Sequence, residues 1–179
     1  LATRDSTLVA LDVDSNLVGR YEFAGNATDT CPGTAQNGTL YGNAAYVNDA
    51  TRGQVLTLDG SGDYVQVAGT FGSPTEVTVG GWVNLTAAGA RNEFISLSDR
   101  VHLVLDQSGL GVKGSIQTGA ASWQDLSSGQ FIAGTGWHHV MYTYSDAGNV
   151  HTLYIDGAAV ATATAPTSIY WTGAGDSYI

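Results

Sequence analysis

Lysine, proline and cysteine are scarce in this chain of 179 residues. It holds one lysine, Lys113, three prolines and one cysteine, Cys31. An intrachain disulfide is therefore excluded, and Cys31 is either a small buried residue or the partner of a cysteine in another segment. No apolar run is long enough to cross a bilayer, which excludes membrane insertion by a helix. No charged-then-apolar signal opens the chain, so we expect a mature or excised segment.

Positive charge is also in short supply. The chain has 6 Lys and Arg residues against 16 Asp and Glu residues, which gives a formal net charge of −10. Phosphate backbones and anionic lipid head groups would repel such a surface, so we exclude nucleic acid and anionic membranes as partners. The same charge is compatible with bound cations.

Glycine, in contrast, is abundant, and the pattern is that of many short strands. There are 24 glycines, and no stretch keeps a helical hydrophobic period. Turn signals recur about every eight to twelve residues, which is typical of an antiparallel sandwich or jelly roll. The length suits one such domain with a single core.

The clearest local pattern lies at 137–164. Residues 137–144 and 150–155 alternate in polarity and are joined by a turn that contains Asp, Gly and Asn. A second turn at Asp156-Gly157 leads into a third strand at 158–164, so the segment predicts a three-stranded meander.

Two other glycine-containing segments carry predictions. Residues 53–60 and 63–67, on either side of a Gly-Ser-Gly turn, predict a hairpin. In the strand predicted at 76–84, the pair Gly80-Gly81 predicts a β-bulge or a site of close packing.

Four motifs, taken in order, resemble one family. They are Leu-x-x-x-Tyr-x-Phe with a following Gly-Asn-x-x-Asp loop, Gly-x-x-Leu-x-Leu-Asp-Gly-x-x-Asp-Tyr-Val-x-Val, Val-Thr-Val-x-x-Trp-Val, and Trp-His-His-Val followed by Leu-Tyr-Ile-Asp-Gly, at residues 17–29, 53–67, 77–83 and 137–157. Together they resemble LamG-like jelly-roll domains of the concanavalin A-like lectin/glucanase superfamily. The resemblance implies an all-β, two-sheet antiparallel jelly-roll sandwich over residues 17–179, preceded by a lead-in strand or linker at residues 1–16.

The resemblance also implies a missing strand. Domains of this kind usually close with an Ile-Asp-Asp/Glu-Val-x-Ile-Tyr strand beside the first strand, and this sequence reaches Ile179 before such a motif. We expect the lead-in at 8–13, continuing polypeptide or another chain to fill the place. Of these we favour strand donation from another segment or chain, which would tie stability to assembly.

The alternation of the predicted strands gives a predicted core. A sandwich buries one face of each strand, so alternate apolar residues should lie between the sheets. The predicted core residues are Tyr21, Phe23, Leu56, Leu58, Val65, Val79, Trp82, Val140, Tyr142, Leu153 and Ile155. Trp137 is likewise expected to pack in the core.

Catalytic and zinc-binding patterns are missing. Glucanases of the superfamily carry paired acids on one strand face, resembling Glu-x-Asp-x-x-Glu, whereas Glu22, Glu76 and Glu93 have no acid two to four residues away. On a strand, His138 and His139 point to opposite faces, so they cannot chelate one ion together. We therefore expect no enzyme activity and structural histidines.

A structural calcium site is a hypothesis for one loop. Residues 25–29 offer the carboxylate of Asp29, the amide of Asn26 and backbone carbonyls, which are the hard oxygen ligands that Ca²⁺ prefers. The resemblance makes this loop a plausible calcium site. The alternative is a turn in which the same side chains cap backbone amides.

Sugar binding requires aromatic rings beside polar groups. Trp123 lies in a polar run, and Tyr170 and Trp171 precede a Gly-rich loop, so these three are the predicted ligand-binding residues. The leading interpretation is a non-catalytic binding or adhesion module of a secreted or cell-surface protein, with carbohydrate as the favoured ligand and a surface protein next. A hydrolase or lyase of the same fold, or an architectural subunit of a surface assembly, are the alternatives.

Overall fold

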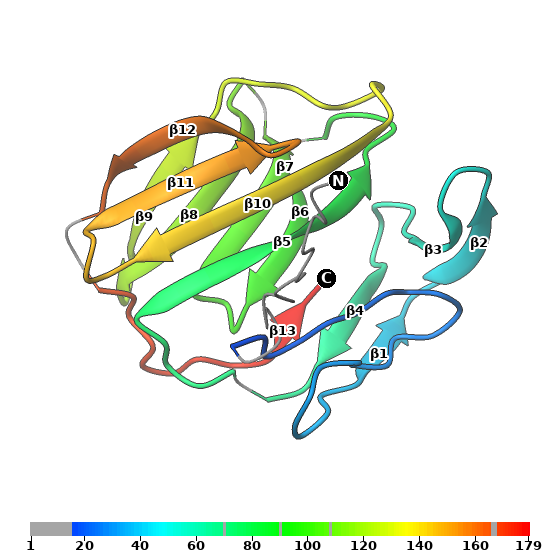
Figure 1. Ribbon diagram of the computed structural model, residues 1–179, viewed down its shortest axis with the longest axis horizontal. Helices are drawn as coiled ribbons and strands as arrows, with labels where there is room; N and C mark the ends of the chain where they lie inside the picture. The colour runs from blue at the N-terminus through cyan, green and yellow to red at the C-terminus, as the bar shows by residue number, and fades with distance from the viewer. Residues whose placement is uncertain (1–15, 70, 90, 108, 166–167) are drawn as a thin grey trace, which may run out of the picture.

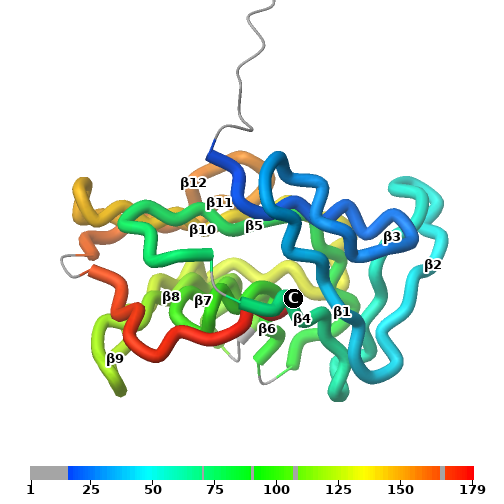
Figure 2. The backbone as a smooth tube through the Cα atoms, turned by 90° about the horizontal axis from the view of Figure 1, so that it is seen from below, coloured from blue at the N-terminus to red at the C-terminus, as the bar shows by residue number. Residues whose placement is uncertain are grey.

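The computed structural model describes residues 16–69, 71–89, 91–107, 109–165 and 168–179. Within these residues the chain is all β, with antiparallel pairing throughout and no helix. Two sheets lie face to face as separate layers (Figures 1 and 2). The predicted two-sheet antiparallel sandwich is confirmed. The lead-in strand predicted at 8–13 lies outside the described residues.

The larger sheet has seven strands, which lie at the back of Figure 1. In spatial order they are β1 (Gly38–Tyr41), β4 (Tyr64–Val67), β13 (Ser177–Tyr178), β6 (Arg91–Leu97), β7 (Val101–Gln107), β8 (Gly111–Gly119) and β9 (Ser122–Ser127). The last strand of the chain therefore lies inside the sheet, between β4 and β6.

The smaller sheet has four strands, which lie at the front of Figure 1. Their order is β12 (Ala158–Thr164), β11 (Val150–Ile155), β10 (Trp137–Ser145) and β5 (Glu76–Asn84). A separate hairpin, β2 (Ala45–Asp49) with β3 (Gly53–Thr57), lies beyond one end of the sandwich. The predicted meander is confirmed as β10, β11 and β12.

Glycine at position 114 lets the two layers approach. A Cβ atom at Gly114 would lie 2.1 Å from the ring of Tyr142, so the tyrosine of β10 fills the space that a side chain on β8 would take. Tyr142 is fully buried, and its hydroxyl hydrogen-bonds with Nδ1 of the buried His151, at 2.9 Å. Gly114 therefore lies on the inner face of β8 together with Val112 and Ile116, and its neighbours Lys113 and Ser115 point outward.

The glycine pair of β5 serves close packing. The pairing of β5 with β10 runs without a register shift over all nine residues, so there is no bulge. A Cβ at Gly80 would lie 2.5 Å from the Val140 carbonyl oxygen, and one at Gly81 would lie 3.1 Å from Phe94. Of the two predicted alternatives, close packing is confirmed.

The predicted core is partly right. Val65, Val140, Tyr142, Leu153 and Ile155 are buried, and Tyr21, Phe23, Leu56 and Val79 are partly buried. Trp82 is 50% exposed and Leu58 is also exposed, so both predictions are wrong. The cause for Trp82 is its register: it pairs with His139, on the face of the sheet opposite to Val140. Trp137 is half-buried on that same outer face.

One predicted hairpin and one expected strand are also wrong. Residues 53–57 pair with β2, whereas β4 pairs with β1 and β13, so 53–67 is no hairpin. Residues 17–23 form an isolated bridge, Tyr21 with Asp29, in place of a regular strand. Next to this bridge, the backbone carbonyl of Arg20 accepts a hydrogen bond from the Thr30 amide. Pairing of this segment with a donated strand stays a prediction.

Candidate functional site

The outer face of the seven-stranded sheet carries a row of polar side chains. Ser96, His102, Ser115 and Asp125 are successive cross-strand partners from β6 to β9. The neighbouring row, Leu103, Gly114 and Leu126, faces the core. The alternation of each strand therefore sends apolar residues inward and polar residues to one shared outer surface.

A pocket of about 440 Å³ lies on this outer face. Its lining comprises three acidic residues, one arginine, one lysine, one histidine, one serine and one tryptophan. Its lining residues are Arg91, Glu93, Asp99, His102, Lys113, Ser115, Trp123 and Asp125. In a chain with 6 Lys and Arg residues, this is an unusual gathering of both charge signs.

His102 lines the pocket, and its hydrogen bonds define which ring nitrogen carries the proton. Its Nδ1 is 2.9 Å from Nη2 of Arg91, and its Nε2 is 3.3 Å from Oδ1 of Asp99. A guanidinium only donates, so Nδ1 accepts and the proton resides on Nε2, which donates to Asp99. Burial lowers the pKa of His102, Glu93 opposes this, and Arg91 adds to it. The ring is therefore neutral near pH 7.

Trp123 forms one wall of the pocket. Its indole stacks on the His102 ring, with 4.5 Å between ring centres and an interplanar angle of 24°. The tryptophan is nevertheless 40% exposed. Because one face of the indole lies on His102, the exposed surface belongs to its other face and edges. An aromatic plane held rigidly beside polar groups is thus available to a ligand.

An ion pair between the buried Lys113 and the exposed Asp125 lines the pocket. Lys113 is buried, and its Nζ donates to Oδ2 of Asp125 at 3.2 Å. The Ser115 hydroxyl donates to the other carboxylate oxygen at 2.7 Å. The Lys113 ammonium has three N–H donors. Among the described residues its acceptor is Asp125. Donors therefore remain for a ligand in the pocket. Glu93 is held by Nε of Arg91 at 2.7 Å.

The three predicted ligand-binding residues do not form one platform. Trp123 lines the pocket. Tyr170 is half-buried, and its backbone amide donates to the Gln117 carbonyl of β8 at 2.8 Å. Trp171 packs against the hydrophobic core, and its indole N–H donates to the Pro74 carbonyl at 3.1 Å. Ligand binding by any of the three stays a prediction.

The other pocket residues were missed because they come from four strands, β6 to β9, and a turn. Arg91, Glu93 and Asp99 lie on β6 and the turn after it, while His102 and Lys113 lie on β7 and β8. One signal was available in the sequence: the single lysine stands in a run of residues that otherwise suits a buried strand. Such an isolated charge on a strand indicates an outward-facing functional position.

Asn26 and Asp29, the residues of the calcium hypothesis, accept hydrogen bonds from backbone amides. Oδ1 of Asp29 accepts from the amides of Arg20 and Cys31, both at 2.9 Å, and Oδ2 accepts from Gln36 at 3.1 Å. Oδ1 of Asn26 accepts from the Thr28 amide at 2.9 Å. Burial opposes ionisation of Asp29, but the three amide bonds outweigh it and lower the pKa of the carboxyl. These bonds favour the alternative, a turn in which the side chains cap backbone amides. A calcium site at Asn26 and Asp29 stays a prediction.

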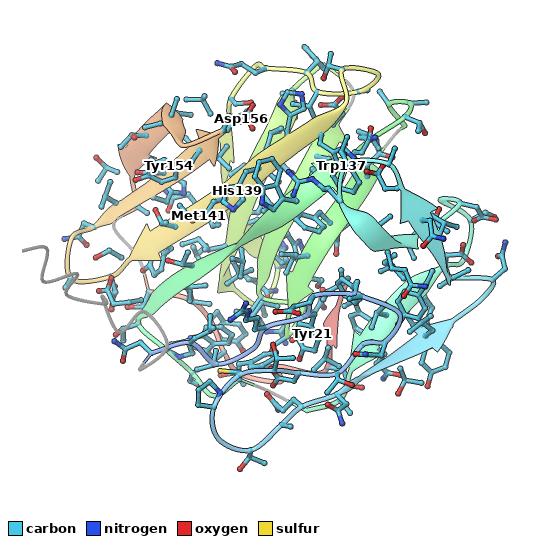
Figure 3. The ribbon with its side chains drawn as sticks, turned by 45° about the vertical axis from the view of Figure 1, so that its right-hand side comes forward. Tyr21, Trp137, His139, Met141, Tyr154 and Asp156 are labelled. Atoms are coloured by element: carbon cyan, nitrogen blue, oxygen red, sulfur yellow. The ribbon has the colours of Figure 1, made fainter. Side chains whose placement is uncertain are left out.

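The outer face of the four-stranded sheet carries Trp82, Trp137, His139, Met141 and Tyr154 (Figure 3). Beside it, Asp156 accepts from Nδ1 of His138 at 2.7 Å and from the His139 amide at 2.9 Å, so these groups close the turn after β11. In the part of the chain that the structure describes, no three His, Cys, Asp or Glu residues are placed to hold a metal ion. The described residues also include no helix long and apolar enough for a membrane.

The comparison with known families identifies the class of the protein. The profile of the concanavalin A-like lectin/glucanases superfamily matches residues 59–179, and the chain belongs to this superfamily. The matched range includes β4 to β13 and every residue that lines the pocket. No curated protein sequence matches the chain.

Solved structures of the same fold come from distant proteins. Domain 4 of AbnA, a GH43 extracellular arabinanase from Geobacillus stearothermophilus, was solved in complex with arabinotriose; it has a TM-score of 0.69 and 16% identity, over 86% of this chain and 77% of that chain. The binding domain of Paraclostridial Mosquitocidal Protein 1 has a TM-score of 0.66 and 13% identity, over 84% of this chain and 40% of that chain. At these identities the likeness establishes the shared fold.

Proposed function

We propose that this domain is a non-catalytic carbohydrate-binding module of a secreted or cell-surface protein. The observation that carries the proposal is Trp123, stacked on His102 and exposed at the wall of a pocket lined with both hydrogen-bond donors and acceptors. A sugar ring presents apolar C–H groups on its faces and hydroxyls around its rim. The indole can pack against the C–H groups, and the ionic groups can hydrogen-bond with the hydroxyls.

The charge of the pocket favours a neutral sugar. Arg91 and Lys113 are each bound to a carboxylate of the pocket, Glu93 and Asp125 respectively. Each of these ion pairs still has N–H donors and carboxylate lone pairs for a ligand, and the pairing leaves the pocket without a large excess of one charge. The arabinotriose complex of the arabinanase domain, which has the same fold, supports sugar as the ligand class.

A hydrolase or lyase is the second candidate, favoured by one observation. Glu93, Asp99 and Asp125 face a single pocket, although the sequence spacing between them showed no paired acids. Two carboxylates that flank a sugar linkage are the requirement for glycoside hydrolysis.

One experiment with a panel of polysaccharides distinguishes a binding module from an enzyme. The purified domain is incubated with arabinan, xylan, cellulose and mannan, and both retention and released products are measured. The proposal predicts retention on at least one polysaccharide with no released product. Turnover that Glu93→Gln or Asp125→Asn abolishes would contradict the non-catalytic role. Absence of retention on every glycan would contradict sugar binding and favour an architectural or protein-binding role.

A further inference from the structure

Lys113 is the one lysine of the chain, and it is buried. The residue is 6% exposed on the outer face of β8, whereas the side chain of Asp125, its ion-pair partner, is 50% exposed. Removal of an ammonium from water is costly, and attraction to a carboxylate that stays in water offsets little of that cost. Buried lysines are rare for this reason. The ion pair alone therefore does not explain a lysine at this place, which points to a role in the pocket.

Lys113 has N–H groups to spare in the pocket that it lines. Its cross-strand partner on β7 is the fully buried Val104, whose side chain has no acceptor. Its partner on β9 is Ser127, and the ammonium reaches diagonally past this residue to Oδ2 of Asp125, at 3.2 Å. Asp125 is the acceptor of Lys113 among the described residues, so the other N–H groups remain for a ligand.

The carboxylate of Asp125 is held in one orientation. Ser115 is its direct cross-strand partner, and the serine hydroxyl donates to Oδ1 at 2.7 Å while Lys113 donates to Oδ2. An ionised carboxylate has about four lone-pair sites, so acceptor sites remain on both oxygens. Asp125 therefore presents acceptors directly beside the donors of Lys113.

A donor and an acceptor side by side match two neighbouring hydroxyls of a sugar ring. Nζ of Lys113 and Oδ2 of Asp125 are 3.2 Å apart, and two gauche hydroxyls on adjacent ring carbons have a similar separation. The oxygen of one hydroxyl accepts from the ammonium, and the other hydroxyl donates to the carboxylate. Both bonds are charge-assisted, which makes them stronger than bonds between neutral groups. An isolated hydroxyl, or a pair in the trans-diaxial arrangement, engages only one of the two side chains.

We propose that Lys113 and Asp125 are the specificity-determining pair of the sugar site, and that they select a sugar unit with a free vicinal diol whose hydroxyls are gauche. This inference rests on the proposed carbohydrate-binding function and specifies its ligand. Ser115 is a positioning residue, because it acts on the ligand through Asp125. In a polysaccharide, the unit that binds is one in which neither hydroxyl of the diol takes part in a linkage.

The test removes one hydroxyl at a time. The methyl glycosides of arabinofuranose, xylose, glucose and mannose are titrated into the intact domain and followed by NMR. The monodeoxy analogues of each glycoside that binds are then titrated in the same way. Loss of either hydroxyl of one vicinal pair is expected to weaken binding by about tenfold or more, and loss of any other hydroxyl to weaken it less.

Two variants separate recognition of the diol from a structural role. Lys113→Met and Asp125→Asn each remove one charge and keep a side chain of similar length. Each is expected to bind the intact glycoside about tenfold more weakly. Each is also expected to bind one of the two critical deoxy analogues as well as it binds the intact glycoside, because the group that recognised the missing hydroxyl is gone. Phe131→Ala, which does not line the pocket, is the control and should discriminate as the parent domain does.

The outcomes distinguish this inference from the proposed function. Equal binding of all deoxy analogues, or unchanged discrimination by the folded variants, would overturn the diol-binding pair while sugar binding stands. Retention of a polysaccharide without binding of any glycoside would also overturn the pair alone. No binding of any glycoside or polysaccharide would overturn both. If a variant does not fold, the analogue series on the parent domain decides, and losses that are not confined to one vicinal pair would overturn the inference.

Discussion

The guanidinium of Arg52 lies 3.5 Å from the ring centre of Trp82 and 5.1 Å from that of Trp137. The turn that carries Arg52 is also fastened by Asp49, whose Oδ2 accepts the Trp137 indole N–H at 3.1 Å. Arg52 and Asp49 thus attach the β2–β3 hairpin to the edge of the four-stranded sheet. This explains why two tryptophans of the motif-rich strands lie outside the core.

We expect Arg52→Ala to loosen this hairpin. Loss of the cation–π contact should lower the free energy of unfolding by about 1 kcal/mol. Thermal melting and amide hydrogen exchange of β2 and β3 measure the effect. Arg20→Ala, which removes an exposed ion pair with Glu22, is the matched control and should change little. Equal effects of the two variants would show that Arg52 makes no special contact.

Asp49 should make the hairpin sensitive to acid. Hydrogen bonds from the Thr51 hydroxyl, the Thr51 amide and the Trp137 indole lower the pKa of Asp49 from 3.8 to about 2. A carboxyl with a lowered folded-state pKa contributes stability above its ordinary pKa and loses it as the pH falls toward about 2. We expect Asp49→Asn to flatten the pH dependence of stability between about pH 4 and pH 2. Parallel curves for the variant and the parent would contradict this role.

His151 should produce a second pH dependence. Burial lowers its pKa from the ordinary value of 6.5, and Asp125 opposes this only in part. The unfolded chain binds a proton near pH 6.5 and the folded chain does not, so stability is complete above that pH and declines as the pH falls through the folded-state pKa. We expect His151→Gln to reduce this decline in urea unfolding measured from about pH 7 to pH 5. An unchanged slope in His151→Gln would refute the assignment.

Calcium should leave the stability of the domain unchanged. A cation that binds only the folded state raises the melting temperature with its concentration. Because amides occupy the oxygens of Asn26 and Asp29, we expect coincident melting curves in chelator and in calcium. A calcium-dependent rise that Asp29→Asn abolishes would restore the calcium hypothesis.

The features that could be predicted from the sequence are those that depend on alternating polarity along a strand and on the residues of a turn. The meander of β10 to β12, the burial of Val140 and Tyr142, and the sandwich class follow from period-two patterns and Asp-Gly turns. The place of β13 between β4 and β6 joins segments more than 80 residues apart, and no local pattern specifies such pairing. Trp82 was misplaced because alternation defines two faces without saying which faces the core.

The pocket was harder to predict for the same reason. Trp123 was found because a tryptophan in a polar run is conspicuous, but its partner His102 stands 21 positions earlier, on a strand that is not its neighbour in the sheet. The side chains converge only through the register of β6 to β9. Paired acids were sought within single strands, whereas the carboxylates of the pocket come from β6, β9 and a turn.

The most direct test of the account is the affinity of Trp123→Ala for the retained polysaccharide. Phe131→Ala is the control, because Phe131 is 55% exposed and does not line the pocket. We predict that a folded Trp123→Ala variant binds about tenfold or more weakly, while Phe131→Ala binds as the parent does. Undiminished binding by a folded Trp123→Ala variant would contradict the placement of the sugar site on the outer face of the seven-stranded sheet.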